Sequence, residues 1–303
     1  MGGKLKLLEF GRGIAAFAVV ICHVHWYLIE TPDYIHFLWP WGSWAVDFFF
    51  VLSWFIIYHV NGHELGSGKP LVFLRRRFYR IVPTYWLILT GALLIRQFLG
   101  NPSHVLHLTP MYLLTNYLLL PSSNLLINPA WSLRHELLFY AVFSIAIYSL
   151  RIGILLAVVW LAAIISSRLL SYGGELPLDV ITNSRNLYFG MGMCIAILVS
   201  RLNLASLLKG GPPLSIWLGQ ISYSLYLCHI PSFLIVHGIL KRTAPQLEWY
   251  WVATLGIAFS VIVAVLISSM FESKFLRWAN GRARRRPLVA SSSPTRGAGA
   301  DSF

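Results

Sequence analysis

Arg12 and His23 stand eleven residues apart, at the start of an apolar stretch over residues 13–29. In an α-helix eleven residues make three turns plus roughly 20°, so both side chains lie on one face, about 16 Å apart along the axis. This spacing predicts that Arg12 lies at a membrane boundary and His23 near the middle of the bilayer. An imidazole in that position can act as a general base. The alternative is a histidine that hydrogen-bonds a neighbouring helix and does no chemistry.

A second polar group has the spacing of a helical stripe. Ser132, Glu136 and Tyr140 are four residues apart, and Trp131 precedes them. Residues at this spacing face the same side of a helix. Glu136 is the only acidic residue between Glu64 and Glu175, and it opens an apolar segment. Its carboxylate is expected to orient a histidine or to bind a substrate hydroxyl; the alternative is an acid favoured by the helix dipole alone.

Four arginines lie close together before a third apolar segment. They stand in the run Arg75-Arg76-Arg77-Phe78-Tyr79-Arg80, which Pro83, Tyr85 and Trp86 follow. Guanidinium groups bind phosphate through paired hydrogen bonds and stack on aromatic rings, so this cluster suits a nucleotide diphosphate. The alternative is an ordinary positive anchor at the membrane surface.

Asp47 is a further acid within an apolar segment, in the run Val46-Asp47-Phe48-Phe49. A charged side chain near mid-bilayer costs at least ~2.5–3.5 kcal/mol on insertion scales. We therefore expect Asp47 to have a partner, one of the histidines or arginines.

Long apolar segments must position these residues. The chain is 57% hydrophobic and only 12% charged, about half the charge of a soluble domain. Eight apolar segments have lengths close to the roughly 17–25 residues that a membrane-spanning helix requires. They predict a polytopic all-α bundle of about eight to ten spanning helices. The stretch 111–120, between Pro110 and Pro121, is too short to span and is expected to be interfacial or re-entrant. The eight apolar segments are 13–29, 44–60, 81–99, 137–150, 152–169, 186–200, 214–239 and 250–273.

The net charge of +13 agrees with this topology. With a cytoplasmic N-terminus and eight crossings, 18 of the 24 basic residues fall on the inner side, together with both termini. This excess explains the charge without nucleic acid, and we expect no nucleic-acid partner. The inner-side residues are Lys4, Lys6, Arg12, Lys69, Arg75, Arg76, Arg77, Arg80, Arg151, Arg201, Lys209, Lys274, Arg277, Arg282, Arg284, Arg285, Arg286 and Arg296.

The domain organisation is simple. Residues 1–279 are predicted to form one transmembrane domain, and residues 280–303, which are polar and contain Arg284-Arg285-Arg286, a disordered basic cytoplasmic tail. Cys22, Cys194 and Cys228 lie within apolar segments without metal-ligand spacing, so no metal is expected.

Five motifs in one order resemble the acyltransferase-3 family of integral membrane O-acyltransferases. The resemblance covers about residues 5–278, and no single motif is decisive. The motifs are Arg12-x10-His23, Val46-Asp47 to Ser53, Arg77-Phe78-Tyr79-Arg80 to Trp86, Trp131-Ser132-Leu133 with Glu136 and Phe139-Tyr140, and Ile221-Ser222-Tyr223 to His229-Ile230-Pro231.

The resemblance implies about ten helices, an acyl-CoA donor entering from the cytoplasm and a glycan hydroxyl as acceptor, in a bacterial inner membrane. It also implies that His23 is catalytic with Arg12 as its basic partner, and that Arg77 and Arg80 handle the donor. Glu136 belongs to the family's Trp-Ser-Leu-x-x-Glu element, and His229 to its Ser-Leu-Tyr-Leu-x-His segment.

Together these observations predict a membrane O-acyltransferase that moves a group, most simply acetyl, from acyl-CoA to a glycan such as an exopolysaccharide or its lipid-linked precursor. His23 serves as a base or as an acyl carrier, and Glu136 or Asp47 orients it. Arg76 and Tyr85 join Arg77 and Arg80 around the donor, while Ser132, Trp131, Tyr140 and His229 support the site. Two alternatives stay open: succinyl transfer, and a proton-coupled transporter that uses His23, Asp47 and Glu136.

Overall fold

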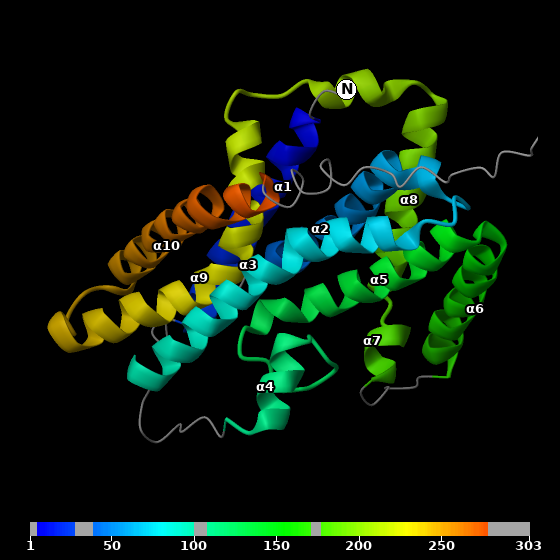
Figure 1. Cartoon of the computed structure of the whole chain (residues 1–303). Helices are drawn as coiled ribbons and strands as arrows, with labels where there is room; N and C mark the ends of the chain where they lie inside the picture. The colour runs from blue at the N-terminus through cyan, green and yellow to red at the C-terminus, as the bar shows by residue number, and fades with distance from the viewer. Residues whose placement is uncertain (1–4, 28–38, 100–107, 171–176, 278–303) are drawn as a thin grey trace, which may run out of the picture.

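The computed structural model describes residues 5–27, 39–99, 108–170 and 177–277, and these form helices and connecting turns without a β-strand (Figure 1). The predicted tail at 280–303 lies outside these residues. The helices are α1 (Lys6–Tyr27), α2 (Trp39–Asn61), α3 (Pro70–Leu99), α4 (Pro110–Tyr117), α5 (Trp131–Tyr148), α6 (Leu150–Leu169), α7 (Leu178–Thr182), α8 (Asn186–Arg201), α9 (Ser215–Thr243) and α10 (Trp249–Leu266). After α10 a π-helical turn, Ile267–Glu272, carries the chain toward residue 277.

Among the described residues, each of the eight apolar segments predicted from the sequence is helical, which confirms the all-α bundle. Six helical stretches among the described residues are long and apolar enough to cross a membrane: Lys6–Val24, Pro40–Glu64, Pro70–Gln97, Leu150–Leu169, Ser215–Thr243 and Trp249–Arg277. The other two are α8, which has 16 residues, and α5, whose first turns carry Arg134, His135 and Glu136. The short stretch at 111–120 forms α4, an eight-residue helix with Thr109 as its N-cap.

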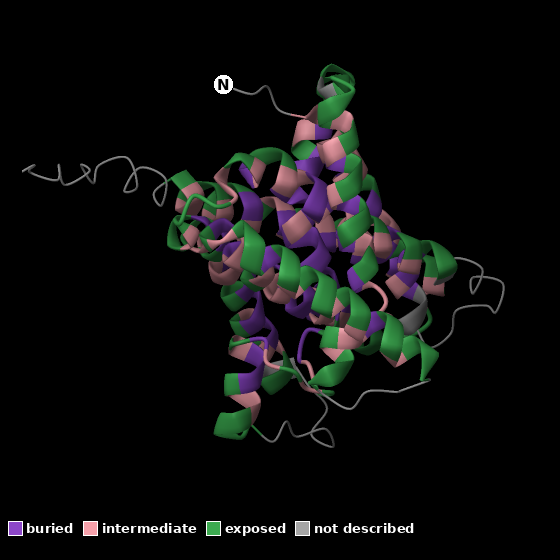
Figure 2. Ribbon diagram, turned by 90° about the vertical axis from the view of Figure 1, so that its right-hand side faces the viewer, coloured by how far each residue is buried: buried purple, intermediate pink, exposed green. Residues whose placement is uncertain are grey.

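α9 lies at the centre of the bundle. It packs against α1, α3 and α10, while α2 packs against α1 and α8, and α5 joins α3 to α6. Figure 2 shows the buried residues where these helices meet and exposed residues on their outer sides. The core includes Tyr85, Phe73, Phe189, Phe233 and Ile57, all almost fully buried. Segments far apart in the sequence therefore meet around α9.

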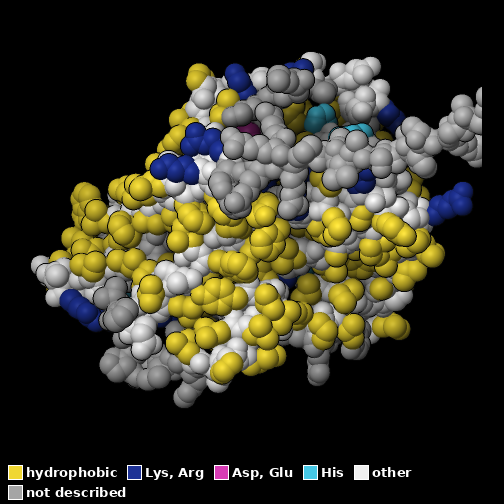
Figure 3. Space-filling view, in the orientation of Figure 1, with side chains coloured by type: hydrophobic (Ala, Val, Ile, Leu, Met, Phe, Trp, Pro, Cys, Tyr) yellow, Lys and Arg dark blue, Asp and Glu magenta, His cyan; other side chains and the backbone are white. Residues whose placement is uncertain are grey.

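The two ends of the bundle differ in charge. We call the end where α1 begins the basic end. At this end the turn between α2 and α3 packs on the last turn of α5: the Gly66 N–H donates to the Ala146 carbonyl, and the Gly68 N–H donates to the Ile147 carbonyl. Figure 3 shows hydrophobic side chains over the middle of one face, with Lys and Arg toward its upper and lower edges. Described basic residues at the basic end are Lys6, Arg12, Lys69, Arg75, Arg76, Arg77, Arg80, Arg151, Arg201, Lys209, Lys274 and Arg277; those toward the opposite end are Arg96, Arg134, Arg168, Arg185, Lys241 and Arg242.

Candidate active site

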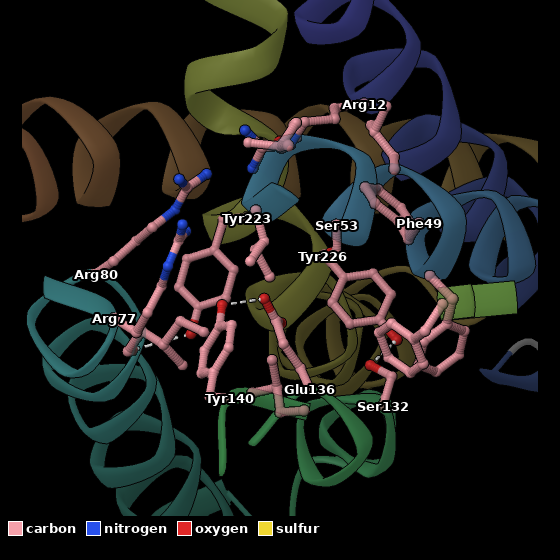
Figure 4. Close-up of a pocket in the computed structure, with 18 of the residues that line it drawn as sticks. Arg12, Phe49, Ser53, Arg77, Arg80, Ser132, Glu136, Tyr140, Tyr223 and Tyr226 are labelled. Atoms are coloured by element: carbon pink, nitrogen blue, oxygen red, sulfur yellow. Dashed lines mark hydrogen bonds between the residues drawn. The ribbon is translucent and has the colours of Figure 1, made fainter. Parts of the chain in front are cut away.

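A cavity of about 100 Å³ lies inside the bundle, and we call it the inner cavity. Aromatic and aliphatic side chains of α2 form much of its wall, and polar groups from α1, α3, α5 and α9 face its interior (Figure 4). The residues that line it are Arg12, Val46, Phe49, Phe50, Leu52, Ser53, Ile56, Ile57, Arg77, Arg80, Ile81, Ser132, Leu133, Glu136, Tyr140, Phe189, Ser222, Tyr223 and Tyr226.

The stripe predicted on α5 faces this cavity. Ser132, Glu136 and Tyr140 all line it, and the Tyr140 hydroxyl donates to the Glu136 carboxylate, as helical spacing of four residues allows. The Ser132 hydroxyl lies 2.9 Å from the Tyr226 hydroxyl of α9, which also donates to the Pro129 carbonyl at 3.0 Å. These contacts hold one carboxylate and three hydroxyls in a mostly apolar cavity.

A larger cavity of about 900 Å³ adjoins the inner cavity at the basic end, and we call it the arginine basin. Arg12, Arg77 and Arg80 line both cavities, so they stand at the boundary between the two. The basin is lined by Glu9, Arg12, Val60, Asn61, Arg76, Arg77, Arg80, Trp217, Gly219, Gln220, Ile221, Val265, Ser268, Ser269, Glu272, Ser273, Leu276 and Arg277.

Different contacts hold these arginines. The Arg77 guanidinium lies over the rings of Phe73 and Tyr140, with 5.2 and 5.6 Å to the centroids. Arg76 donates to Glu64 at 2.7 Å, away from the inner cavity. Arg12 donates to Glu9 at 3.3 Å on its own helix. These two ring contacts favour this position of the Arg77 guanidinium, because a guanidinium is attracted to aromatic faces.

His23 lies apart from the inner cavity, against His229. The centroids of the two imidazole rings are 5.1 Å apart, and the Nδ1 atom of His23 lies 2.8 Å from the Val19 carbonyl oxygen. Tyr226 lines the inner cavity, and its ring centroid is 6.3 Å from that of His229. Neither histidine lines the inner cavity, and Tyr226 is a lining residue whose ring contacts that of His229. Arg12 and His23 both face α9, as their spacing on α1 predicts.

Asp47 forms the ion pair that its burial requires, with an arginine. Arg185 Nε donates to its carboxylate at 3.0 Å, and the Arg185 guanidinium lies 5.0 Å from the centroid of the Trp131 ring. Neither Asp47 nor Glu136 hydrogen-bonds to His23; the Val19 carbonyl orients that ring instead.

Tyr85 is separate from both cavities. It is fully buried, and its hydroxyl donates to the Asn116 carbonyl at 2.7 Å. Five residues separate it from Arg80, which turns the two side chains about 140° apart around α3. Tyr85 therefore attaches α3 to α4 and does not reach the arginine basin.

The sequence analysis did not assign a site role to Tyr223 and Tyr226, which line the inner cavity, or to Arg185, which pairs with Asp47. The sequence does contain a signal for Arg185: it stands directly before an apolar segment, where a charged side chain is expected to have a partner. Among the described residues there is no group of three or more His, Cys, Asp or Glu side chains that could hold a metal ion.

Comparisons with known proteins identify the family of this chain. A family model described as an acyltransferase domain of the acyltransferase-3 type matches residues 5–173. The chain is 29% identical over 234 residues to the "Exopolysaccharide production protein ExoZ" of Rhizobium meliloti (strain 1021), covering 74% of this chain and 67% of that protein. It is 33% identical over 109 residues to "Protein 2 in picA locus" of Rhizobium radiobacter, covering 34% of this chain and 52% of that protein. No solved structure matches the chain. Because the family model covers more than half of the sequence, the chain belongs to the acyltransferase-3 family. Since the described residues include six helices long and apolar enough to span a membrane, it is a membrane acyltransferase.

Proposed function

We propose that this protein transfers an acetyl group from acetyl-CoA to a hydroxyl of an exopolysaccharide or of its lipid-linked precursor. Family membership supports acyl transfer, and the similarity to a protein named for exopolysaccharide production supports the acceptor class. The products are an O-acetyl ester on the glycan and free CoA.

The observation that carries the proposal is that Arg12, Arg77 and Arg80 line both the arginine basin and the inner cavity. Coenzyme A carries its phosphates at one end and its thioester at the end of a long, flexible arm. Guanidinium groups in the basin suit the phosphates, with Arg76 and Arg277 as further candidates. An arm passing between the shared arginines would bring the thioester through the inner cavity, past Glu136, to Tyr226, whose ring contacts His229 and so lies near His23.

His23 is proposed as the base that takes the proton of the acceptor hydroxyl. A carbonyl oxygen only accepts hydrogen bonds, so the contact with Val19 places the proton of the neutral ring on Nδ1 and leaves the Nε2 lone pair free to act. The hydroxyl oxygen attacks the thioester carbon, the C–S bond breaks, and the proton ends on the departing sulfur. A transient acyl group on His23 Nε2 is the second form of the same hypothesis. Glu136 is proposed to accept a hydrogen bond from the incoming hydroxyl.

The same proposal assigns an orientation. The basic end is placed in the cytoplasm of a bacterial inner membrane, together with both termini, because Lys and Arg collect on the cytoplasmic side. Acetyl-CoA would then enter the arginine basin directly from the cytosol.

Two alternatives lead to different experiments. Succinyl transfer requires a further cation to meet the free carboxylate, and labelled succinyl-CoA tested beside labelled acetyl-CoA separates the two donors. The transporter hypothesis needs His23, Asp47 and Glu136 in one proton relay. Asp47 is instead paired with Arg185, and Glu136 accepts a hydrogen bond from Tyr140, so these contacts favour acyl transfer over transport.

The decisive test compares the acetyl content of exopolysaccharide from cells with the wild-type protein, with His23→Ala and with no copy. We expect loss of acetylation in His23→Ala, at an unchanged level of protein in the membrane. Membranes containing the protein should also release CoA from acetyl-CoA only when the glycan is present. Wild-type acetylation by His23→Ala would refute the mechanism, and equal acetylation without the protein would refute the function.

A further inference from the structure

His229 has an unpaired nitrogen in the centre of the bundle. The residue is fully buried in the middle of α9, and its Nδ1 atom lies 3.2 Å from the Leu225 carbonyl oxygen, one helical turn earlier. Because a carbonyl only accepts, Nδ1 carries the proton and Nε2 keeps a lone pair. Nε2 is buried and has no hydrogen-bond partner among the described residues. A buried acceptor without a donor costs free energy, so its presence calls for an explanation.

His23 has the same arrangement on α1. Its Nδ1 also donates to the carbonyl four residues earlier, and its Nε2 is likewise the nitrogen with a lone pair. The ring planes of the two histidines are inclined by 53°, with 5.1 Å between centroids. Two imidazoles thus lie in contact, each with one nitrogen tied to its own helix and the other free to receive a proton.

Neighbouring groups are already engaged. The Tyr226 hydroxyl is bonded to Ser132 and to the Pro129 carbonyl, and the Cys228 thiol points to the Ser260 carbonyl at 3.6 Å. No carboxylate of the described residues is hydrogen-bonded or ion-paired to either ring. If His23 gains a proton, the acceptor nearest to its ring among these groups is therefore the Nε2 lone pair of His229.

We propose that His229 is a positioning residue for His23, whose Nε2 accepts a hydrogen bond from the Nε2–H that His23 gains during acyl transfer. The inference rests on the proposed function, in which His23 takes the proton of the acceptor hydroxyl. A small rotation of the rings makes this bond, which is absent from the resting arrangement. His229 stays neutral throughout, and the proton passes from His23 to the CoA thiolate after the C–S bond breaks. In a site with a low dielectric constant an imidazolium is costly without an acceptor, and His229 supplies one.

The test uses two substitutions at this position. His229→Leu removes the lone pair and keeps an apolar side chain of similar length, so the protein should fold at least as well as the wild type. We expect kcat for CoA release from acetyl-CoA to fall about 10- to 100-fold, the strength of a hydrogen bond to a charged group, with KM for acetyl-CoA within about twofold of the wild type. In His229→Gln the amide oxygen stands near the place of Nε2 and can accept, so part of the loss should be recovered.

His237→Leu is the matched control, because it removes another imidazole from α9 two turns away, and it should keep wild-type kcat. Full activity of His229→Leu, in protein whose thermal unfolding matches the wild type, would overturn the proposal. A loss of activity in His229→Gln as large as in His229→Leu would do so as well, since acceptance of a hydrogen bond would then be irrelevant. The activity of His23→Ala separates the two hypotheses. If either contradicting result is found and His23→Ala is inactive, only the proposed role of His229 is wrong. If His23→Ala is active, the proposed function of His23 as the base is itself wrong.

Discussion

Arg185, the N-cap of α8, and Asp47 on α2 are 138 residues apart in the chain and form an ion pair with 3.0 Å between Nε and Oδ1. The same guanidinium donates to the Ser43 hydroxyl at 3.1 Å and covers the ring of Trp131 on α5. One side chain thus joins three helices at the end of the bundle opposite the arginine basin. Trp131 immediately precedes Ser132, so the arrangement fixes the first turn of the helix that carries Glu136.

Removal of the Asp47–Arg185 pair should destabilise the fold rather than alter donor binding. Both side chains are partly exposed, at 17% and 35%, so we expect a coupling energy of about 1–2 kcal/mol in a double-mutant cycle of Asp47→Ala and Arg185→Ala. Unfolding in detergent measures it. KM for acetyl-CoA should stay unchanged in both single variants, and strictly additive effects would show that the pair contributes nothing.

Two glycines on α8 should respond in opposite ways to alanine. A Cβ atom at Gly192 would stand 2.1 Å from the Val51 carbonyl oxygen of α2, whereas at Gly190 nothing lies within 4 Å. Gly192→Ala should therefore destabilise the bundle by about 1–3 kcal/mol through overpacking. Gly190→Ala should leave stability unchanged or raise it by up to about 1 kcal/mol, because alanine favours a helix. Thermal unfolding of the two purified variants tests this, and equal midpoints would contradict the α2–α8 packing.

Arg80→Gln should weaken donor binding. Arg80 lines both cavities and its loss removes one charge from the proposed phosphate site, so we expect KM for acetyl-CoA to rise about tenfold. Arg75→Gln is the control, since Arg75 is exposed, belongs to the same cluster and lines neither cavity. Equal KM values in the two variants would mean that the charge of the cluster, and not the position of Arg80, matters.

Glu136→Gln should reduce turnover without loosening the fold. The amide oxygen can still accept the hydrogen bond from Tyr140, but the negative charge in the inner cavity is lost. We expect kcat to fall about 100-fold, in the range typical of acid–base groups, with an unchanged unfolding temperature. Tyr140→Phe should do the reverse, keeping most of kcat and losing about 1 kcal/mol of stability. A wild-type kcat in Glu136→Gln would remove Glu136 from the mechanism.

Much of the architecture could be predicted because hydropathy and helical spacing are local properties. The eight apolar segments are helices, and the spacing of Ser132, Glu136 and Tyr140 correctly placed all three on one face. The need of a buried acid for a partner correctly predicted an ion pair for Asp47. Each of these inferences uses residues within one helix or the cost of burying one charge.

Contacts between distant segments could not be predicted in the same way. Nothing in the spacing of α1 shows that His23 meets a residue 206 positions later, or that Tyr226, whose ring contacts His229, lines the same cavity as Glu136. The prediction that Tyr85 helps to bind the donor was wrong for a related reason. Tyr85 is near Arg80 in sequence, but five residues of helix turn its side chain away from Arg80 and toward α4. Such relationships depend on how helices pack, which single-sequence periodicity leaves open.

α8 has a further consequence for the surrounding bilayer. Its 16 residues span about 24 Å, less than the roughly 30 Å of hydrocarbon in a typical membrane. Leu187, Met191, Ile195 and Leu198 form an exposed stripe along it, so lipid tails meet this helix directly. If α8 crosses the bilayer, we expect the lipids beside it to tilt or shorten to cover that stripe, and this hydrophobic mismatch would bring the two aqueous phases closer together here than in the undisturbed membrane.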